Sequence, residues 1–303
     1  MTSDSMDSAS FLREKARSLG FIAVGFTRPS CLPYFDSFLS WVSERRYGGM
    51  DWVTRYVNLR QDPGMLLAGC KTIITLAYPY SPDIPTSPDG LMAARYTQGL
   101  GEDYHVRVKR LGKQLARVVS ELFPGSKSRV CVDSAPLLER SLAYASGIGF
   151  FGKNNMLIIP GYGSYFYLAE VLTTAAILHH EPKPMDSQCG SCTKCLEACP
   201  TKALEAPYVH NSSKCLSYFT IEHRGPLSHD VAKVMGKRFF GCDICQEVCP
   251  FNRKRSKAII SLPSAEEILQ MGEKEFHQVF GKTAFARAGL SKLKESVRIA
   301  LLK

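Results

Sequence analysis

The residues with the clearest chemical meaning are eight cysteines that lie between Cys189 and Cys249. The first four follow the pattern Cys189-x2-Cys192-x2-Cys195-x3-Cys199-Pro200. Three thiolates at this spacing let one loop wrap three corners of an iron–sulfur cubane, while the cysteine before proline leads away to another cluster. The pattern therefore predicts electron-transfer chemistry.

The second half of this segment, Cys242-x2-Cys245-x3-Cys249-Pro250, matches only the last three cysteines of the pattern, and Cys215 can supply the missing one. The crossed ligation of two-cluster ferredoxins then predicts two 4Fe-4S clusters. The first ligand set is Cys189, Cys192, Cys195 and Cys249, and the second is Cys199, Cys215, Cys242 and Cys245. Zinc is the alternative, because paired C-x2-C units also bind zinc. The other cysteines, Cys31, Cys70 and Cys131, lie in apolar settings and are predicted to be ordinary buried thiols.

Composition limits the class of protein that can position these cysteines. The chain has 303 residues, 45% apolar and 22% charged, which excludes a disordered, collagenous or coiled-coil protein. No apolar run approaches the roughly 18 residues of a membrane span, and the N-terminus lacks a signal-peptide pattern, so we expect a cytoplasmic protein without membrane contact. The net charge of +10 favours a polyanionic partner such as nucleic acid, although a merely solvated basic surface is the alternative.

Helical and strand patterns are interleaved along the chain. We expect helices at about 10–19, 103–122 and 136–146, and strands at about 21–26, 72–80, 130–132, 155–159 and 165–172. This order predicts an α+β fold with a mixed sheet. A shift to Cys, Pro and Lys near residue 184 predicts an N-terminal domain at 1–184, a ferredoxin-like double-cluster domain at 185–255 and a short helical tail at 256–303.

Several of these segments together resemble one family, the epoxyqueuosine reductases, which are iron–sulfur and cobalamin enzymes that complete the queuosine base of tRNA. The resemblance covers nearly the whole chain. It rests on Arg60-Gln61-Asp62-Pro63, Asp103-Tyr104-His105, Val132-Asp133-Ser134 to Glu139-Arg140, Gly147 to Asn154, Tyr162-Gly163-Ser164, Cys189 to Thr201, Cys215 to Tyr218, Thr220-Ile221-Glu222 and Gly241 to Pro250. It implies a short form, without the C-terminal helical-repeat domain of many members.

The resemblance implies that residues 1–184 bind cobalamin and that the protein reduces epoxyqueuosine to queuosine at the wobble position (34) of tRNA, the last step of queuosine biosynthesis. The implied partners are a tRNA with a GUN anticodon and an external low-potential electron donor, with the protein acting as a monomer. Three alternatives stay open: a cobalamin-dependent reductive dehalogenase, a double-cluster ferredoxin-type electron carrier, and an RNA-binding module with a structural cluster.

Site residues follow from the same resemblance. Asp133 is implied to be the catalytic general acid, a role that requires a pKa raised by a dry pocket; the sequence alone favours a helix cap at this position. Arg140 is the implied substrate contact. The implied cofactor contacts are Arg60, Asp133, Lys153, Asn154, Leu157, Leu168, Ser217 and Asp243.

Two further patterns have both a functional and a structural interpretation. Asp103-Tyr104-His105 does not complete the D-x-H-x-x-G cobalt-ligand motif, because position 108 is valine, so we expect His105 to be a polar residue in the first turn of a helix capped by Asp103. Basic residues form two groups that either hold RNA phosphates or are solvated faces: Arg107, Lys109, Arg110, Lys113 and Arg117, and Arg253, Lys254, Arg255 and Lys257.

Overall fold

The computed structural model describes residues 4–30, 32–180, 182–252 and 256–302, and its N-terminal part is built on a four-stranded sheet in the order β1-β2-β8-β5. These strands are β1 (Ala23–Thr27), β2 (Thr72–Pro79), β8 (Phe166–Thr173) and β5 (Ser128–Cys131). All three pairings are antiparallel, so the prediction of a mixed sheet is wrong for this sheet. The central strand β2 is buried continuously over residues 72–77, a pattern more typical of parallel sheets. It therefore lacks the in–out alternation that would have predicted antiparallel pairing.

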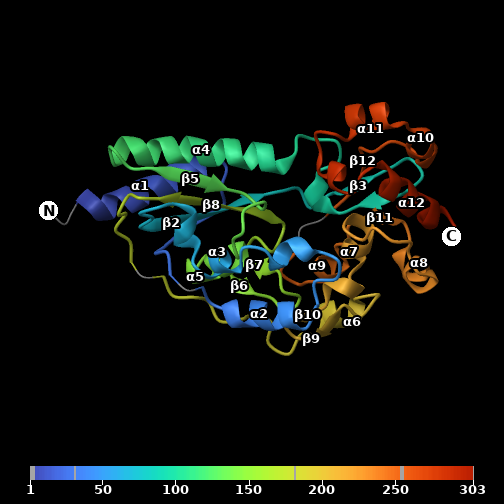
Figure 1. The fold of residues 1–303 in the computed structure, drawn as a ribbon, viewed down its shortest axis with the longest axis horizontal. Helices are drawn as coiled ribbons and strands as arrows, with labels where there is room; N and C mark the ends of the chain where they lie inside the picture. Colours follow the sequence, from blue (N-terminus) through green and yellow to red (C-terminus); the bar gives the residue numbers. More distant parts are fainter. Residues whose placement is uncertain (1–3, 31, 181, 253–255, 303) are drawn as a thin grey trace.

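Helices cover both faces of this sheet. Figure 1 shows α1 (Asp4–Ser18) and α4 (Tyr104–Leu122) lying along one face, with α5 (Glu139–Ala145) on the other. Leu12 of α1 and Leu115 of α4 are fully buried in the core against Val171 of β8. The helix predicted from residue 103 is confirmed. It begins with Asp103 as N-cap, whose carboxylate accepts a hydrogen bond from the His105 N–H at 2.8 Å.

A second four-stranded sheet, in the order β11-β4-β3-β12, joins chain segments that are far apart in sequence. Its strands are β3 (Ile84–Thr86), β4 (Met92–Ala93), β11 (Arg238–Phe240) and β12 (Ala258–Ile260). Two of its pairings are parallel and one is antiparallel, so the mixed sheet of this α+β fold lies here. The sheet takes strands from both sides of the predicted boundary at residue 184. The segments on the two sides therefore share backbone hydrogen bonds.

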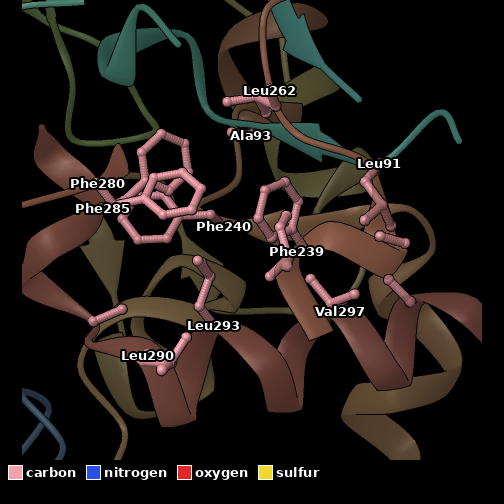
Figure 2. Packing of buried hydrophobic residues seen from close by; sticks show 14 of the residues in the cluster. Leu91, Ala93, Phe239, Phe240, Leu262, Phe280, Phe285, Leu290, Leu293 and Val297 are labelled. Atoms are coloured by element: carbon pink, nitrogen blue, oxygen red, sulfur yellow. The ribbon is translucent and has the colours of Figure 1, made fainter. Parts of the chain in front are cut away.

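The C-terminal helices pack onto this second sheet around an aromatic core. Phe239 and Phe240 of β11 are fully buried against Phe280 and Phe285, and Leu293 of α12 closes the cluster from the other side (Figure 2). The helices are α10 (Ala265–Gln270), α11 (Glu273–Val279) and α12 (Leu290–Leu301). The predicted helical tail is thus part of a hydrophobic core that also includes Leu91.

Short elements hold the cysteine loops between these two layers. They are α6 (Lys194–Ala198), β9 (Leu204–Ala206), β10 (Val209–His210), α7 (Leu216–Ile221), α8 (His229–Met235) and α9 (Ile244–Glu247). Others lie along the N-terminal part: α2 (Phe35–Ser43), α3 (Val57–Gln61), β6 (Phe150–Phe151) and β7 (Leu157–Ile158). Among the residues that the structure describes, no helix is long and apolar enough to cross a membrane.

Candidate active site

The eight clustered cysteines line two separate cavities. A small cavity of about 150 Å³ is lined by Cys189, Cys192, Cys195 and Cys249, and a large cleft of about 1120 Å³ is lined by Cys199, Cys215, Cys242 and Cys245. These groups are the two predicted ligand sets, although ligation itself stays a prediction. None of the described cysteines forms a disulfide. Cys131 is buried and Cys70 half-buried, as expected of ordinary thiols, while Cys31 lies outside the described residues.

Two consecutive side chains connect the loops that carry the two cysteine groups. Lys153 Nζ donates hydrogen bonds to the carbonyl oxygens of Gly190 at 2.6 Å and Cys192 at 3.1 Å. Asn154 Nδ2 donates to the carbonyl oxygen of Cys245 at 3.1 Å. Because these contacts reach both loops from one dipeptide, they fix the small cavity relative to the large cleft.

The second cysteine group has the chemistry of a metal-cluster site. Burial and neighbouring cysteines together raise the pKa of Cys242 to about 12 and that of Cys245 well above its usual value. Ser217 Oγ accepts a hydrogen bond from the Cys242 N–H at 3.1 Å and so orients this loop. Crowded, buried thiols ionise only beside strongly positive groups such as metal ions, so this set of sulfur donors fits a cluster.

The large cleft brings together nearly all of the predicted cofactor and substrate residues. Those that line it are Arg60, Asp133, Arg140, Asn154, Leu157, Leu168, Ser217 and Asp243. Lys153 is the exception, because it lines the small cavity and not the large cleft. The cleft volume exceeds the roughly 300–1,000 Å³ that is usual for small-molecule pockets, so it admits a large cofactor.

Asp243 lies at the cleft wall, but its carboxylate is already hydrogen-bonded. Its Oδ2 accepts from the backbone N–H of Arg95 at 2.7 Å and from the Arg95 guanidinium at 3.3 Å, and its Oδ1 accepts from Gln246 at 3.1 Å. Arg95 is almost fully buried and also contacts Glu247 at 2.7 Å. In this structure the Asp243 carboxylate therefore binds Arg95. A contact between Asp243 and the cofactor stays a prediction.

Asp133 follows β5 and opens into the cleft. Its backbone has φ +54°, in the left-handed region, and its side chain is 59% exposed. Its Oδ2 accepts from the Tyr104 hydroxyl at 2.8 Å and lies 3.1 Å from His105 Nε2. The helix-cap interpretation is wrong, because α5 begins only at Glu139 and its N-cap is Leu138.

His105 lies between two carboxylates. Its Nδ1 is 2.7 Å from Asp103 Oδ1, and its Nε2 faces Asp133. Burial lowers the pKa of His105, but the bonds to Asp133 and Asp103 outweigh it and raise the pKa above its usual value. Desolvation at the cleft wall acts to raise the pKa of Asp133 although much of its side chain is exposed, but the hydrogen bonds with His105 and Tyr104 outweigh it and lower the pKa. The direction is opposite to the raised pKa that a general acid requires, because these partners stabilise the carboxylate, and the catalytic role of Asp133 stays a prediction.

Sequence reasoning assigned no site role to three residues that the structure places around Asp133. Tyr104 and His105 were expected only as part of a helix start, although that start is confirmed. Glu139 lines the cleft and accepts a hydrogen bond from the Asp133 N–H at 2.5 Å. The one sequence signal for the contact between Asp133 and Glu139 was their short separation along the chain. A segment this short, between the end of a strand and the start of a helix, can turn back and bring the two residues together.

The two basic groups lie outside the cleft wall or outside the described residues. On α4, Lys109, Arg110, Lys113 and Arg117 are exposed, and Arg107 bonds to Glu102 at 3.3 Å. Arg253, Lys254 and Arg255 are outside the described residues, and Lys257 is exposed. Their contact with RNA stays a prediction.

The fold and these two cavities define an iron–sulfur protein of the double-cluster class, with a large cofactor-sized cleft beside the second cysteine group. Residues 188–252 match the family model described as a 4Fe-4S double cluster binding domain, which favours clusters over zinc. Residues 60–134 match the model described as epoxyqueuosine reductase QueG, DUF1730.

Complete relatives agree with these matches. The chain is 34% identical over 285 residues to an epoxyqueuosine reductase from Cyclobacterium marinum, covering 91% of each protein, and 30% identical over 305 residues to that of Escherichia coli, covering 96% of this chain and 79% of the relative. The chain therefore belongs to the epoxyqueuosine reductase family.

Solved structures of epoxyqueuosine reductases share the fold. One, with an epoxyqueuosine-modified tRNA-Tyr stem loop, has a TM-score of 0.85 and 29% identity, covering 97% of this chain and 81% of that chain. Another, from Bacillus subtilis, has a TM-score of 0.83 and 29% identity over the same shares, and is described with its catalytic aspartate loop swung out of the active site.

Proposed function

We propose that this chain reduces epoxyqueuosine to queuosine at the wobble position of tRNA, as the last step of queuosine biosynthesis. The observation that carries the proposal is the single cleft that holds both the Asp133 carboxyl group and the second cysteine group. Reduction of an epoxide to an alkene takes up two electrons and two protons and releases water. A source of electrons and a source of protons must therefore meet at one place.

Cobalamin bound in this cleft would supply a cobalt nucleophile able to open the carbon–oxygen bond of the epoxide. Arg60, Asn154, Leu157 and Leu168 would hold it, with Ser217 beside the second cluster. The buried Arg60 fits such a ligand, because it lines the cleft and its Nε has no hydrogen-bond partner among the described residues. In this proposal Lys153 acts on the loop of the first cluster instead.

We assign the resting proton of the site to His105. Both ring nitrogens face carboxylate oxygens, and only the imidazolium can donate to both at once. Asp133 is then an ionised acceptor that holds this proton beside the reacting oxygen, and the Tyr104 hydroxyl fixes its orientation. Protonation of the departing oxygen draws on the His105–Asp133 pair, and Arg140 at the cleft wall contacts the substrate.

The remaining parts of the proposal concern partners. An external low-potential donor passes electrons to the first cluster, at the small cavity, and from there they reach the second cluster at the cleft. The macromolecular substrate is a tRNA with a GUN anticodon, whose unpaired wobble base enters the cleft. We propose that the protein does this as a cytoplasmic monomer.

The test is a turnover assay on anaerobically purified protein loaded with clusters and cobalamin. An anticodon stem-loop that carries epoxyqueuosine should lose one oxygen atom, as measured by mass spectrometry of its nucleosides. Asp133→Asn protein with the same cluster and cobalamin content is the control. An unchanged stem-loop would reject the proposal, halide release from an organohalide would support the dehalogenase instead, and protein unable to bind a corrinoid would support the electron carrier.

A further inference from the structure

A pair of acidic side chains lies behind Asp133, and the mechanism above does not use it. Glu170 lies in the middle of β8, paired with Thr75 on one neighbouring strand and Cys131 on the other. It is fully buried, and neither of its carboxyl oxygens has a partner at ordinary hydrogen-bond distance among the described residues. An unpaired carboxylate in the interior of a sheet is very unfavourable, so this group must be neutral or serve a neighbour.

The neighbour with which Glu170 interacts is Glu139, at the start of α5. Burial and the Asp133 charge raise the pKa of Glu139 to about 8, and burial together with Glu139 raises that of Glu170 further. The other titratable or charged groups that act on Glu139 or are affected by it are Arg60 on α3, Tyr104 on α4, Cys131 on β5 and Arg140 on α5. These raised pKa values favour the neutral, protonated form of the pair.

Glu139 also holds the backbone of the catalytic loop. Its Oε1 accepts the Asp133 N–H at 2.5 Å, at the residue whose backbone is left-handed. A non-glycine residue persists in this region only where its surroundings hold it there. A neutral carbonyl acceptor can do this without repelling the Asp133 carboxylate a few ångströms away, whereas an ionised one would push it out.

We propose that Glu139 is a neutral latch that holds Asp133 in the cleft, and that Glu170 backs this latch as a second neutral acid. Both are positioning residues, since neither is required to touch the substrate. The inference rests on the proposed role of Asp133, and it explains how the loop that carries Asp133 is kept at the cleft. The Bacillus subtilis relative is described with its catalytic aspartate loop swung out of the active site. A loop of this kind can therefore leave the active site in that protein.

Three variants test the latch in protein loaded with clusters and cobalamin. Glu139→Ala removes the acceptor, Glu139→Gln keeps a neutral carbonyl oxygen, and Glu170→Gln keeps a neutral group in the sheet. Glu121→Ala, at an exposed glutamate of α4, is the matched control. Hydrogen–deuterium exchange of the peptide that spans residues 131–138 reports the loop position independently of turnover, and iron content confirms that each variant is folded.

We expect exchange at this peptide to rise about tenfold in Glu139→Ala, the factor that one hydrogen bond contributes. Its kcat should fall while the KM for the stem-loop stays unchanged, and both glutamine variants should remain near wild type. Wild-type exchange in Glu139→Ala, or a Glu139→Gln variant as loose as the alanine variant, would overturn the latch. Failure of wild-type protein to reduce the stem-loop would reject the proposed function alone, because the exchange comparison does not depend on it.

Discussion

The two cavities differ in how the chain builds them. The small cavity is lined by short stretches around residues 153–158, 188–195 and 249–251, and four of its lining residues are the first cysteine set. The large cleft draws on α2, α4, α5, β8 and both halves of the second cysteine set. One is a local metal-binding motif, and the other is assembled by the tertiary fold.

The two cavities also differ in the kinds of side chain that line them. The small cavity contains cysteines and Lys153, but neither Asp133 nor His105 lies there. The large cleft is lined by the second cysteine group and also by Tyr104, Asp133 and Glu139. His105 does not line it, but its Nε2 contacts Asp133. Asn154 lines both cavities, so the route between them is short. Substitutions in the two cavities should therefore have separable effects.

The largest effect is expected from a cysteine of the large cleft. Cys215→Ser should abolish turnover and remove about half of the roughly eight irons per chain, because it breaks only the cluster also held by Cys199, Cys242 and Cys245. Cys192→Ser is the matched change at the small cavity and should remove the other half. Iron and sulfide analysis with electron paramagnetic resonance measures this. Loss of all iron from folded Cys215→Ser protein would argue against the crossed ligation.

A smaller effect is expected from the acid of the cleft. Asp133→Asn should keep both clusters and bound cobalamin but slow single-turnover reduction by about 10² to 10⁴, the usual range for acid–base catalysis. The control is Asp230→Asn, at an aspartate whose side chain is 94% exposed on α8. Wild-type turnover in Asp133→Asn would leave this carboxyl group without a catalytic role.

The pH profile should identify the resting proton. The pKa of His105 is raised, so its protonated contacts are complete below about pH 6.5, its usual pKa, and disappear as the pH rises through the raised value. The pKa of Asp133 is lowered, so its ionised form is lost only at acid pH. We therefore expect kcat to fall on the alkaline side by about one decade per pH unit.

Variants separate the groups that could cause this alkaline fall. His105→Gln should flatten it and slow turnover by about 10²-fold, whereas His277→Gln, at an exposed histidine of α11, should leave it unchanged. If the fall persists in His105→Gln and disappears in Glu139→Gln, the titrating group is Glu139 and the assignment to His105 is incorrect.

The grouping of the cysteines was easier to predict from the sequence than the contacts around Asp133. Cysteine spacing is a local property, so the ligand sets could be assigned from Cys189 to Cys249 before any fold was known. The helix that begins after Asp103 was equally legible, because its cap and apolar periodicity lie within one segment. Strand direction could not be predicted from the sequence. The strands β2 and β8 pair although they are far apart along the chain, and both are largely buried on both faces.

The acid site was only partly predictable for the same reason. Asp133 was identified through the family resemblance, but its pKa depends on Tyr104 and His105, which belong to α4. No sequence pattern singled out Glu170, and only the register of β8 against β5 pairs it with Cys131, two residues before Asp133. Long-range pairing decides such electrostatics, and no local pattern encodes it.

The smallest effect is expected from the basic residues that could bind RNA. The basic run Arg253-Lys254-Arg255 follows Asn252, whose Nδ2 donates to Ser164 Oγ and to the Gln246 carbonyl oxygen, both at 2.9 Å. Phe251 lines the small cavity, and Ser164 and Gln246 line the cleft. On α4, Lys109, Arg110 and Lys113 are exposed, and none of them lines the cleft.

Replacing Arg253, Lys254 and Arg255 with glutamine should therefore reduce the salt dependence of stem-loop binding, by about 0.7 in the slope of log K against log salt for each phosphate that the variant no longer neutralises. The matched triple change at Lys109, Arg110 and Lys113 should alter that slope less, because those side chains lie away from the cleft wall. Fluorescence anisotropy at several salt concentrations measures both. Equal slopes in the two triple variants and in the wild-type protein would exclude both basic groups from the RNA-binding site. A larger change in the α4 variant would place that site on the sheet face that α4 covers.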